Sequence, residues 1–386
     1  MRVLHLIPGK IFGGIETTLV TRARFRHLAA EMVSEFAVCF ECRLSQELRS
    51  VGVPVHFLGN VRVSNPLTVW RARRRMRGLL RSRPFDVVFC HMEWTHAIFA
   101  PVARDAGVAV AYGIHHPISG TSWPDRWAAR TRPDIAIALT HFLAREAEKI
   151  FPNVPVEVAY NPVVAPPSLN QSERRAIRSQ AGTPDDAVVI IQACRMQAGK
   201  GHRVCLEALA QLRDLPGWQC WQVGGPQRAA EQQYFETLRQ HAAQLGLAHQ
   251  VHFWGQRSDV ARLLAAADIY CQPNDTFREG LGNVFVEAMR SGLPVVTSAI
   301  GAAPEIIDGA CGFLLAPGDV DSLAATLEKL VHNADLRVKL GNGGRSRAAS
   351  QFAPEVQIPR LYAGLAAAVS RNHISPNRNV WTAVNQ

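Results

Sequence analysis

The sequence predicts an α/β protein built from two doubly wound, Rossmann-like domains. Short apolar runs rich in Val and Ile alternate with helical patterns up to Tyr160, and a second series of the same kind begins at Val188. Such runs are typical of parallel strands that helices cover on both faces. At 386 residues the chain is long enough for two domains, each with its own core.

The apolar runs predict seven strands in the first half and six in the second. They cover residues 3–7, 36–40, 53–58, 86–90, 109–114, 135–139 and 156–160, then 188–192, 218–223, 251–254, 269–271, 294–297 and 313–315. We expect a first domain over residues 1–165, a linker over 166–186, where prolines break regular structure, and a second domain over 187–352. A helix over 353–370 and a loose tail over 371–386 follow. Because ligands of open parallel sheets bind outside the carboxyl ends of the strands, the domains are expected to face each other across a cleft.

The composition is that of a globular protein, with 47% hydrophobic and 19% charged residues. No apolar run reaches the roughly 18 residues that a membrane-spanning helix needs, and the first residues enter a strand and do not resemble a signal peptide. We therefore expect a cytoplasmic protein.

The net charge of +10 is concentrated in the first half of the chain. Seven arginines lie within Arg71–Arg83, in a segment whose apolar side chains, Val69, Ala72, Met76, Leu79 and Leu80, share one helical face. This cationic helix is interpreted either as a solvated surface helix or as a contact for anionic lipid or a phosphorylated acceptor. The sequence has no basic stripe interleaved with aromatic residues and no nucleic-acid-binding motif, so nucleic acid is not expected as a partner.

The stretch Asn274–Ser298 carries the densest functional pattern. It contains a turn, a loop with two glycines, a helix expected to begin near Asn283, and a strand. A helix that starts after a glycine loop suits an anion, because its first backbone N–H groups have no partners within the helix. Glu279 and Glu287 flank this point, and carboxylates there can accept hydrogen bonds from the hydroxyl groups of a nucleotide sugar.

A cationic loop follows the first strand of the second half. Arg195 and Lys200 lie five residues apart on this glycine-containing loop. They can reach one diphosphate from two sides, the guanidinium as a fork and the ammonium as a point charge, and would stabilise the charge of a leaving group. The alternative interpretation is a pair of solvated loop cations.

In the first half, Gly13 and Gly14 follow the first strand and precede a helix. Their spacing matches neither the dinucleotide fingerprint nor the P-loop, so a dehydrogenase or P-loop enzyme is not expected. The pair is either a phosphate- or sugar-binding turn or a tight strand-to-helix turn. His115 and His116 end a later strand, where alternation lets one of them face a ligand. No metal is expected, because the sequence has neither a complete ligand set nor an Asp-x-Asp pair.

The order of these motifs resembles that of the retaining GT-B glycosyltransferases of family 4. The likeness spans the whole chain. It rests on the E-x7-E signature from Glu279 to Glu287 and on the pieces around it: Gly13–Glu16, His115, Asn161, Arg195, Lys200, Gly292–Val296, Pro304–Glu305 and Gly312–Leu315. In this sequence His116 stands where the family usually has an acid, so the sequence leaves open which histidine reaches the sugar.

The resemblance implies a GT-B fold and a metal-independent hexosyltransferase without a cofactor, using a nucleoside diphosphate sugar as donor. It implies that Arg195 and Lys200 bind the diphosphate, that Glu279 binds hydroxyls of the transferred sugar, and that Glu287 binds the ribose. The remaining implied contacts are backbone amides of Gly280, Leu281, Gly282 and Asn283 to the donor, Gly14 near the phosphates, and His115 near the sugar and the acceptor. The departing phosphate itself would take the acceptor proton. The C-terminal helix would cross back to the first domain.

The expected function is therefore transfer to a glycan or polyprenyl-linked glycan, in polysaccharide or glycolipid synthesis at the inner face of a membrane. Two other classes remain open. One is another enzyme of the same architecture, such as a sugar-nucleotide epimerase or a glycan phosphorylase. The other is a non-catalytic nucleotide-sugar-binding protein.

Overall fold

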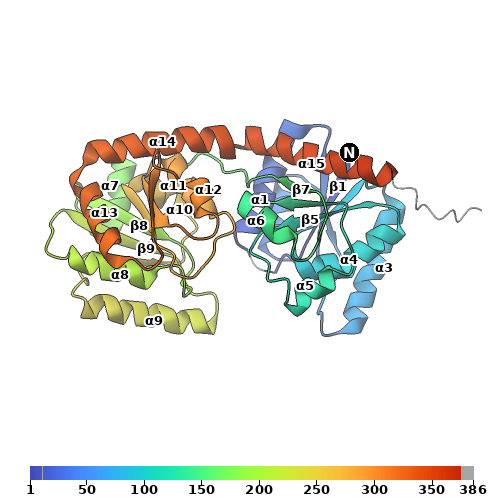
Figure 1. Cartoon of the computed structure of the whole chain (residues 1–386), viewed down its shortest axis with the longest axis horizontal. Helices are drawn as coiled ribbons and strands as arrows, with labels where there is room; N and C mark the ends of the chain where they lie inside the picture. Colours follow the sequence, from blue (N-terminus) through green and yellow to red (C-terminus); the bar gives the residue numbers. More distant parts are fainter. Residues whose placement is uncertain (11, 375–386) are drawn as a thin grey trace, which may run out of the picture. The chain divides into compact units, whose positions relative to one another are not determined.

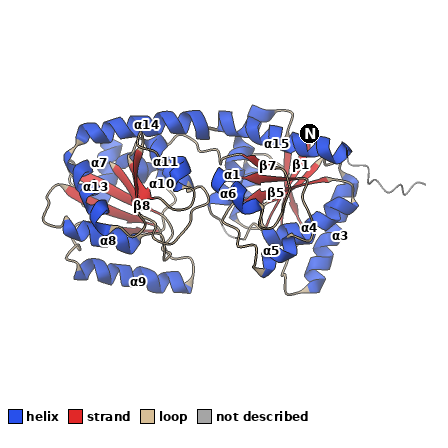
Figure 2. Cartoon of the chain, viewed as in Figure 1, coloured by secondary structure: helices blue, strands red, loops and turns tan. Residues whose placement is uncertain are grey.

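The computed structural model describes residues 1–10 and 12–374 (Figure 1). The chain forms two compact units. Unit 1 contains Met1–Pro162 and the chain from Pro354 onward, and unit 2 contains Val163–Ala353. Each unit is a parallel sheet with helices on both faces (Figure 2). The predicted pair of doubly wound α/β domains is confirmed.

Unit 1 holds a seven-stranded sheet in the order β3-β2-β1-β4-β5-β6-β7. Its strands are β1 (Arg2–Ile7), β2 (Val33–Val38), β3 (Val55–Phe57), β4 (Val87–Cys90), β5 (Ala109–Ile114), β6 (Ile135–Ala138) and β7 (Val156–Val158). Its helices are α1 (Gly14–Arg24), η1 (Arg26–Ala29), α2 (Arg43–Ser50), α3 (Pro66–Ser82), α4 (Glu93–Asp105), α5 (Trp123–Ala128), α6 (His141–Ala147) and α15 (Pro354–Ile374). The order reverses between β1 and β4, which is the topological switch point of the sheet.

Unit 2 holds a six-stranded sheet in the order β10-β9-β8-β11-β12-β13. Its strands are β8 (Val188–Ala193), β9 (Trp218–Val223), β10 (Val251–Gly255), β11 (Ile269–Gln272), β12 (Val295–Ser298) and β13 (Gly312–Leu315). Its helices are α7 (Gln171–Gln180), α8 (His202–Gln211), α9 (Ala229–Gln244), α10 (Val260–Ala266), α11 (Asn283–Ser291), α12 (Ala303–Ile306), α13 (Val320–His332) and α14 (Ala334–Phe352). Here β8 and β11 flank the switch point, with Ile190 opposite Ile269.

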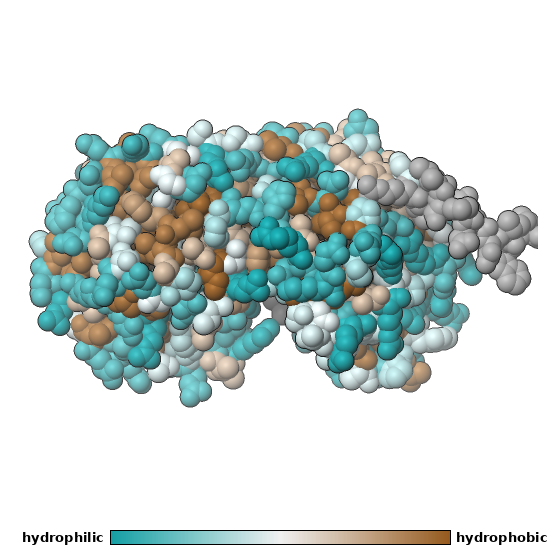
Figure 3. Space-filling model, in the orientation of Figure 1, coloured by the Kyte–Doolittle hydropathy of each residue, from teal (hydrophilic) through white to brown (hydrophobic). Residues whose placement is uncertain are grey.

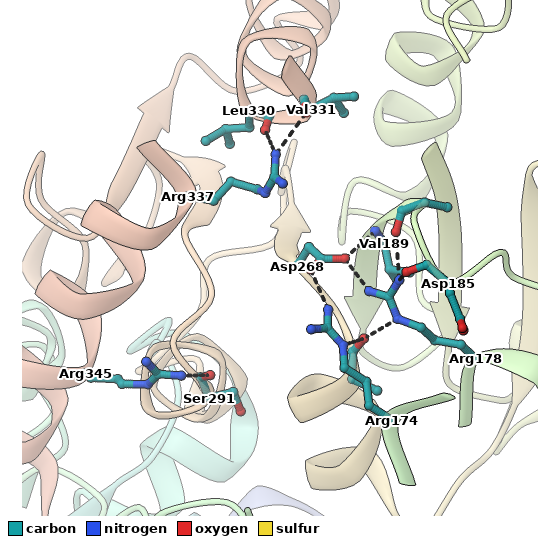
Figure 4. A network of polar contacts seen from close by, with 12 residues as sticks. Arg174, Arg178, Asp185, Val189, Asp268, Ser291, Leu330, Val331, Arg337 and Arg345 are labelled. Atoms are coloured by element: carbon teal, nitrogen blue, oxygen red, sulfur yellow. Dashed lines mark hydrogen bonds and ion pairs between the residues drawn. The ribbon is translucent and has the colours of Figure 1, made fainter. Parts of the chain in front are cut away.

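The predicted linker over 166–186 is wrong, because α7 lies inside it and belongs to unit 2. Asn170 caps this helix, and Glu173 completes a capping box. Figure 4 shows how the helix is held: Arg174 and Arg178 both bind the carboxylate of Asp268, at 2.6 and 2.5 Å. The same carboxylate accepts a 2.8 Å hydrogen bond from the backbone of β8, so the helix is an integral part of the sheet unit.

The C-terminal helix was expected over 353–370, but α15 continues to Ile374. It packs on the sheet of unit 1, where Ile358, Leu361 and Leu365 join strand residues such as Phe89 in one buried cluster. Of the expected tail over 371–386, the first four residues belong to this helix, and 375–386 lie outside the described residues.

The basic helix is α3, and Ala72 and Met76 on its apolar face are fully buried. Two arginines of this segment stabilise the fold: Arg73 of α3 donates to the backbone oxygen of Ile98 at 2.8 Å, and Arg83, directly after α3, pairs with the buried Glu35. On the face shown in Figure 3, hydrophilic side chains cover most of the surface, with smaller hydrophobic areas between them. None of the helices in residues 1–10 and 12–374 is long and apolar enough to cross a membrane.

Candidate functional site

The predicted donor residues of unit 2 gather at its switch point, on the loops that follow β8 and β11. The two loops touch through backbone atoms. The backbone N–H groups of Asp275 and Phe277 both donate to the carbonyl oxygen of Gly199, at 3.1 Å each. Gly201 lies so close that an added Cβ would stand 1.9 Å from the oxygen of Pro273, and its φ of +76° also favours glycine. This close approach places the cationic loop beside the acidic one.

Lys200 and Glu279 form an ion pair across these loops. Their side chains are only 10% and 13% exposed, so the pair is shielded from solvent. The Lys200 ammonium also lies 3.8 Å from the ring centroid of Phe277, a cation–π contact. The Glu279 carboxylate accepts a second hydrogen bond, at 3.0 Å, from the side-chain amide of Gln272. The site therefore holds one buried positive and one buried negative charge, both with further partners.

A buried polar chain behind the pair positions Glu279. The Tyr270 hydroxyl donates to the side-chain oxygen of Gln272 at 2.6 Å. The side-chain NH2 group of Gln272 donates to the side-chain oxygen of Asn274 at 2.9 Å as well as to Glu279. Asn274 is fully buried, and its Nδ2 has no hydrogen-bond partner within the described chain. Sequence reasoning missed Gln272, and it assigned no role to Asn274, the first residue of the predicted functional stretch. The available signal was polar residues directly after the apolar run of a central strand.

Arg195 stands at the start of the cationic loop. Its guanidinium donates to the side-chain oxygen of Gln197 at 2.6 Å, and no carboxylate pairs with it among the described residues. A partly buried guanidinium with no carboxylate partner is suited to an anionic group of a ligand. The two cations of this loop therefore differ in their partners: Lys200 is paired with the Glu279 carboxylate, whereas Arg195 binds the side-chain amide of Gln197.

The helix expected near Asn283 is α11, which begins at that residue. Gly282 precedes it with a φ of +74°, and a Cβ there would stand 2.5 Å from the Phe285 ring. Glycine is required at this turn, with Gly280 and the buried Leu281 just before it. The positive end of the helix dipole lies at Asn283 and favours an anion nearby.

Glu287 lies on α11, four residues after Asn283, and its side chain is partly buried. Burial raises the pKa of its carboxyl group from 4.5 to about 7. No described side chain pairs with it. The group is therefore protonated in about half of the molecules near neutral pH, and a ligand that donates hydrogen bonds to it would favour the charged form.

The raised pKa predicts a pH-dependent stability. The folded protein keeps this proton up to about pH 7, whereas the unfolded chain releases it near 4.5, so the contribution to the free energy of unfolding falls as pH rises between these values. Relative to Glu287→Gln, wild type should lose about 1–2 kcal/mol from pH 5 to pH 8, less than the full pKa difference because burial is partial. Urea unfolding at both pH values measures this, with the exposed Glu328→Gln as the charge-matched control. Equal pH dependence of wild type and Glu287→Gln would contradict it.

Gly14 and His115 lie in unit 1. Gly14 is the first residue of α1, and the preceding Gly13 N–H donates to the Glu16 carboxylate at 3.0 Å. His115 follows β5 and is hydrogen-bonded through its Nε2 to His91 at 3.0 Å. His116 turns to the surface and pairs with Glu93 at 2.9 Å, and its hydrogen bond with that carboxylate raises the pKa of His116. The two histidines therefore differ completely in environment.

Two family models match the chain. "Glycosyl transferase 4-like domain" covers residues 13–161 and "Glycosyl transferases group 1" covers residues 173–347. Among curated relatives, the D-inositol 3-phosphate glycosyltransferase of Stackebrandtia nassauensis is 33% identical over 56% of this chain and 50% of its own. A GDP-mannose-dependent mannosyltransferase of Corynebacterium glutamicum, named for monoacylated alpha-(1-6)-phosphatidylinositol monomannoside, is 27% identical over 74% of this chain and 77% of its own. The chain thus spans about half the length of the first relative and three quarters of the second.

Among solved structures, Anabaena HepE in complex with UDP has a TM-score of 0.81 at 22% identity, covering 95% of this chain and 100% of its own. WaaG, a glycosyltransferase involved in lipopolysaccharide biosynthesis, has a TM-score of 0.65 at 21% identity, covering 97% of this chain and 100% of its own. At these identities the likeness shows the fold alone, which is GT-B. Together with the two matched domains, these findings show that the chain belongs to the group 1 glycosyltransferases.

Proposed function

We propose that the protein is a retaining hexosyltransferase that moves a sugar from a nucleoside diphosphate sugar to a glycan or polyprenyl-linked glycan acceptor, without a metal ion or cofactor. The observation that carries the proposal is the shielded Lys200–Glu279 pair beside Arg195 at the switch point of unit 2. One anion and one polyhydroxyl group are the ligands that such a set of charges recognises. HepE, which shares the fold, was solved with UDP and with UDP-glucose.

In this proposal Arg195 and Lys200 neutralise the diphosphate as its bond to the sugar breaks, and Glu279 accepts hydrogen bonds from sugar hydroxyls. Glu287 accepts from the ribose, and the backbone of Gly280–Asn283 faces the donor at the positive end of α11. In unit 1, we assign phosphate binding to Gly14 and hydroxyl binding to His115. The Corynebacterium glutamicum relative, which is named for a phosphatidylinositol monomannoside, favours a glycolipid acceptor.

A donor screen followed by product analysis tests the proposal. Thermal shift against UDP-, GDP- and ADP-sugars should identify a donor, since a ligand that binds only the folded state at 100 times its Kd stabilises it by about 2.7 kcal/mol. With that donor and an acceptor, nucleoside diphosphate and a new glycosidic bond should appear in equal amounts. An epimerised nucleotide sugar, a sugar phosphate, or donor binding without turnover on any acceptor would each overturn the transferase assignment.

We further propose that the protein is cytoplasmic and contacts the inner face of an anionic membrane through α3. Leu67 and Trp70 of this helix are 64% and 54% exposed, and Trp70 lines an open pocket of about 410 Å³ with Arg71, Arg74 and Arg75. Exposed tryptophan and leucine beside several arginines are the combination that favours an anionic lipid surface.

Replacing Arg71, Arg74, Arg77 and Arg81 by Gln should abolish flotation with anionic liposomes, because each surface cation contributes about 1 kcal/mol to binding. The charge-matched control replaces four other exposed arginines, Arg43, Arg175, Arg203 and Arg213, by Gln. We expect the control to float like wild type. Equal flotation of both variants would show that α3 does not bind the membrane.

A further inference from the structure

Two tryptophans of α5 form an exposed aromatic surface in unit 1. Trp123 is 58% exposed, and the partly buried Trp127 stacks against it, with ring centroids 6.0 Å apart and 28° between the ring planes. Together with Val63, which lies in the loop before α3, they line an open pocket of about 530 Å³. The pair presents apolar area that a ligand with an apolar ring face would remove from water.

Two arginines complete the lining, and the whole site is named the Trp–Arg pocket: Val63, Trp123, Arg126, Trp127 and Arg130. Both arginines are exposed. Neither forms an ion pair or a side-chain hydrogen bond with another residue of 1–10 and 12–374. The pocket therefore offers two guanidinium groups to an anionic group, beside an aromatic surface.

The local sequence turns these side chains outward. Ser122 caps α5, and its hydroxyl accepts from the backbone N–H of Asp125 at 3.3 Å. Asp125 and Ala128 are buried on the inner side of the helix, so the remaining side chains lie on the outer side. The Asp125 carboxylate accepts from the Ser119 hydroxyl at 2.7 Å and from the Gly120 N–H at 3.0 Å. The one acid of this helix is thus bound to its own loop and does not neutralise the pocket.

The pocket lies at the carboxyl edge of the unit 1 sheet. The segment 115–122 joins the end of β5 to α5, and Val63 follows the end of β3. Helix α4 packs against both α3 and α5, which brings these two segments to one side of the sheet (Figure 1). Ligands of open parallel sheets bind at this edge. The segment that begins at His115, the residue proposed to bind a hydroxyl, leads directly to Trp123.

We propose that the Trp–Arg pocket binds an acidic sugar of the acceptor glycan, one that carries a carboxylate or a phosphate. The C–H face of the sugar ring packs on the indole rings, and the guanidinium groups donate hydrogen bonds to the anionic group. The identity of the ligand as an acceptor rests on the proposed function, and the pocket adds that this acceptor is negatively charged.

The walls of the pocket favour a sugar over a lipid surface. The pocket beside Trp70 is lined by α3 alone, whereas the Trp–Arg pocket is lined by α5, the residues after it and the loop before α3. Walls from separate segments can enclose a ring, whereas a single helix face suits contact with an extended surface.

Binding is tested by NMR of the full-length protein with 15N-labelled tryptophan. The charged probes are trigalacturonic acid and mannose 6-phosphate, and their uncharged counterparts are the trimethyl ester and mannose. A charged probe should shift the indole N–H signals of Trp123 and Trp127 and leave that of Trp70 in place. The uncharged counterpart should bind at least about tenfold more weakly, because the charge-assisted hydrogen bonds are lost.

The two charged probes show whether the pocket prefers a carboxylate or a phosphate. Equal binding of each charged probe and its uncharged counterpart would overturn the proposal. Equal binding of inorganic phosphate or of UDP would also overturn it, since the site would then recognise a bare anion or a nucleotide. None of these measurements needs turnover, so their failure leaves the transferase assignment standing, and failure of the donor screen leaves an acidic-sugar site.

Two variants separate the roles of the rings and the charges. Trp123→Ala should raise the Kd of the tighter-bound charged probe at least about tenfold. Arg126→Gln with Arg130→Gln should remove the preference for the charged probe. Because these side chains are exposed, thermal unfolding should change little in either variant.

The matched control is Trp70→Ala with Arg74→Gln on α3, where the Arg74 guanidinium lies 5.8 Å from the Trp70 ring centroid. This control should keep the wild-type Kd for the charged probe. Trp123→Ala should in turn float with anionic liposomes like wild type. Loss of flotation in Trp123→Ala with an unchanged Kd for the probe would assign the exposed tryptophans to a lipid surface and overturn the proposal.

Discussion

Replacing Lys200 or Glu279 by alanine is expected to lower kcat/KM for sugar transfer by about a hundredfold to a thousandfold. In the proposed reaction Lys200 is a buried charge that stabilises the departing diphosphate, and preorganised charges of this kind are commonly worth about 3–4 kcal/mol in the transition state. Each variant also leaves the other charge buried without its partner, so the free energy of unfolding should fall by about 3 kcal/mol. Steady-state kinetics and urea unfolding measure the two effects.

A double variant separates the loss of stability caused by an unpaired buried charge from the loss of catalytic activity. Lys200→Met with Glu279→Gln leaves no buried charge, and the glutamine can still accept from the Gln272 amide. We expect it to regain most of the lost stability and none of the activity. Arg178→Met is the control for an ion pair outside the site, since Arg178 is 3% exposed and binds Asp268. It should lose stability and keep its donor KM. Transfer within about tenfold of wild type in Lys200→Ala would disprove the assigned role.

The second large effect is expected for Gly201→Ala. Its Cβ would stand 1.9 Å from the Pro273 oxygen, and a backbone atom cannot yield as a flexible side chain can. The two loops must then separate, which breaks the contact between Lys200 and Glu279. We expect the loss of most donor binding in a thermal-shift assay and a stability loss of about 2–4 kcal/mol, above the roughly 1–2 kcal/mol of a left-handed alanine alone.

Gly246→Ala isolates the conformational part of that loss. Gly246 has nearly the same φ, +77° against +76°, but a Cβ there meets nothing within 4 Å. It should cost only the left-handed strain and leave donor binding intact. If both alanine variants bind the donor equally well, the close approach of the two loops does not support the site.

Much of the fold could be predicted because its strands are coded locally. Runs such as Val188–Ile191 are apolar at every position, which is typical of a strand buried on both faces. Glycine before Asn283 likewise predicted where α11 begins. The linker prediction was wrong because the prolines around it outweighed the weaker signal of the α7 cap at Asn170, and the bonds that hold α7 come from Asp268, far along the chain.

The sequence by itself determined the two α/β domains, the loops with chemically active residues, and the family to which the chain belongs. Only the tertiary structure decided which side chains meet. Lys200 and Glu279 are 79 residues apart, and His5 and His91 are 86 apart. Each contact exists because the strand order places β8 beside β11 and β1 beside β4. Hydrophobic patterns depend on near neighbours in the chain, whereas hydrogen bonds between loops depend on which strands lie side by side.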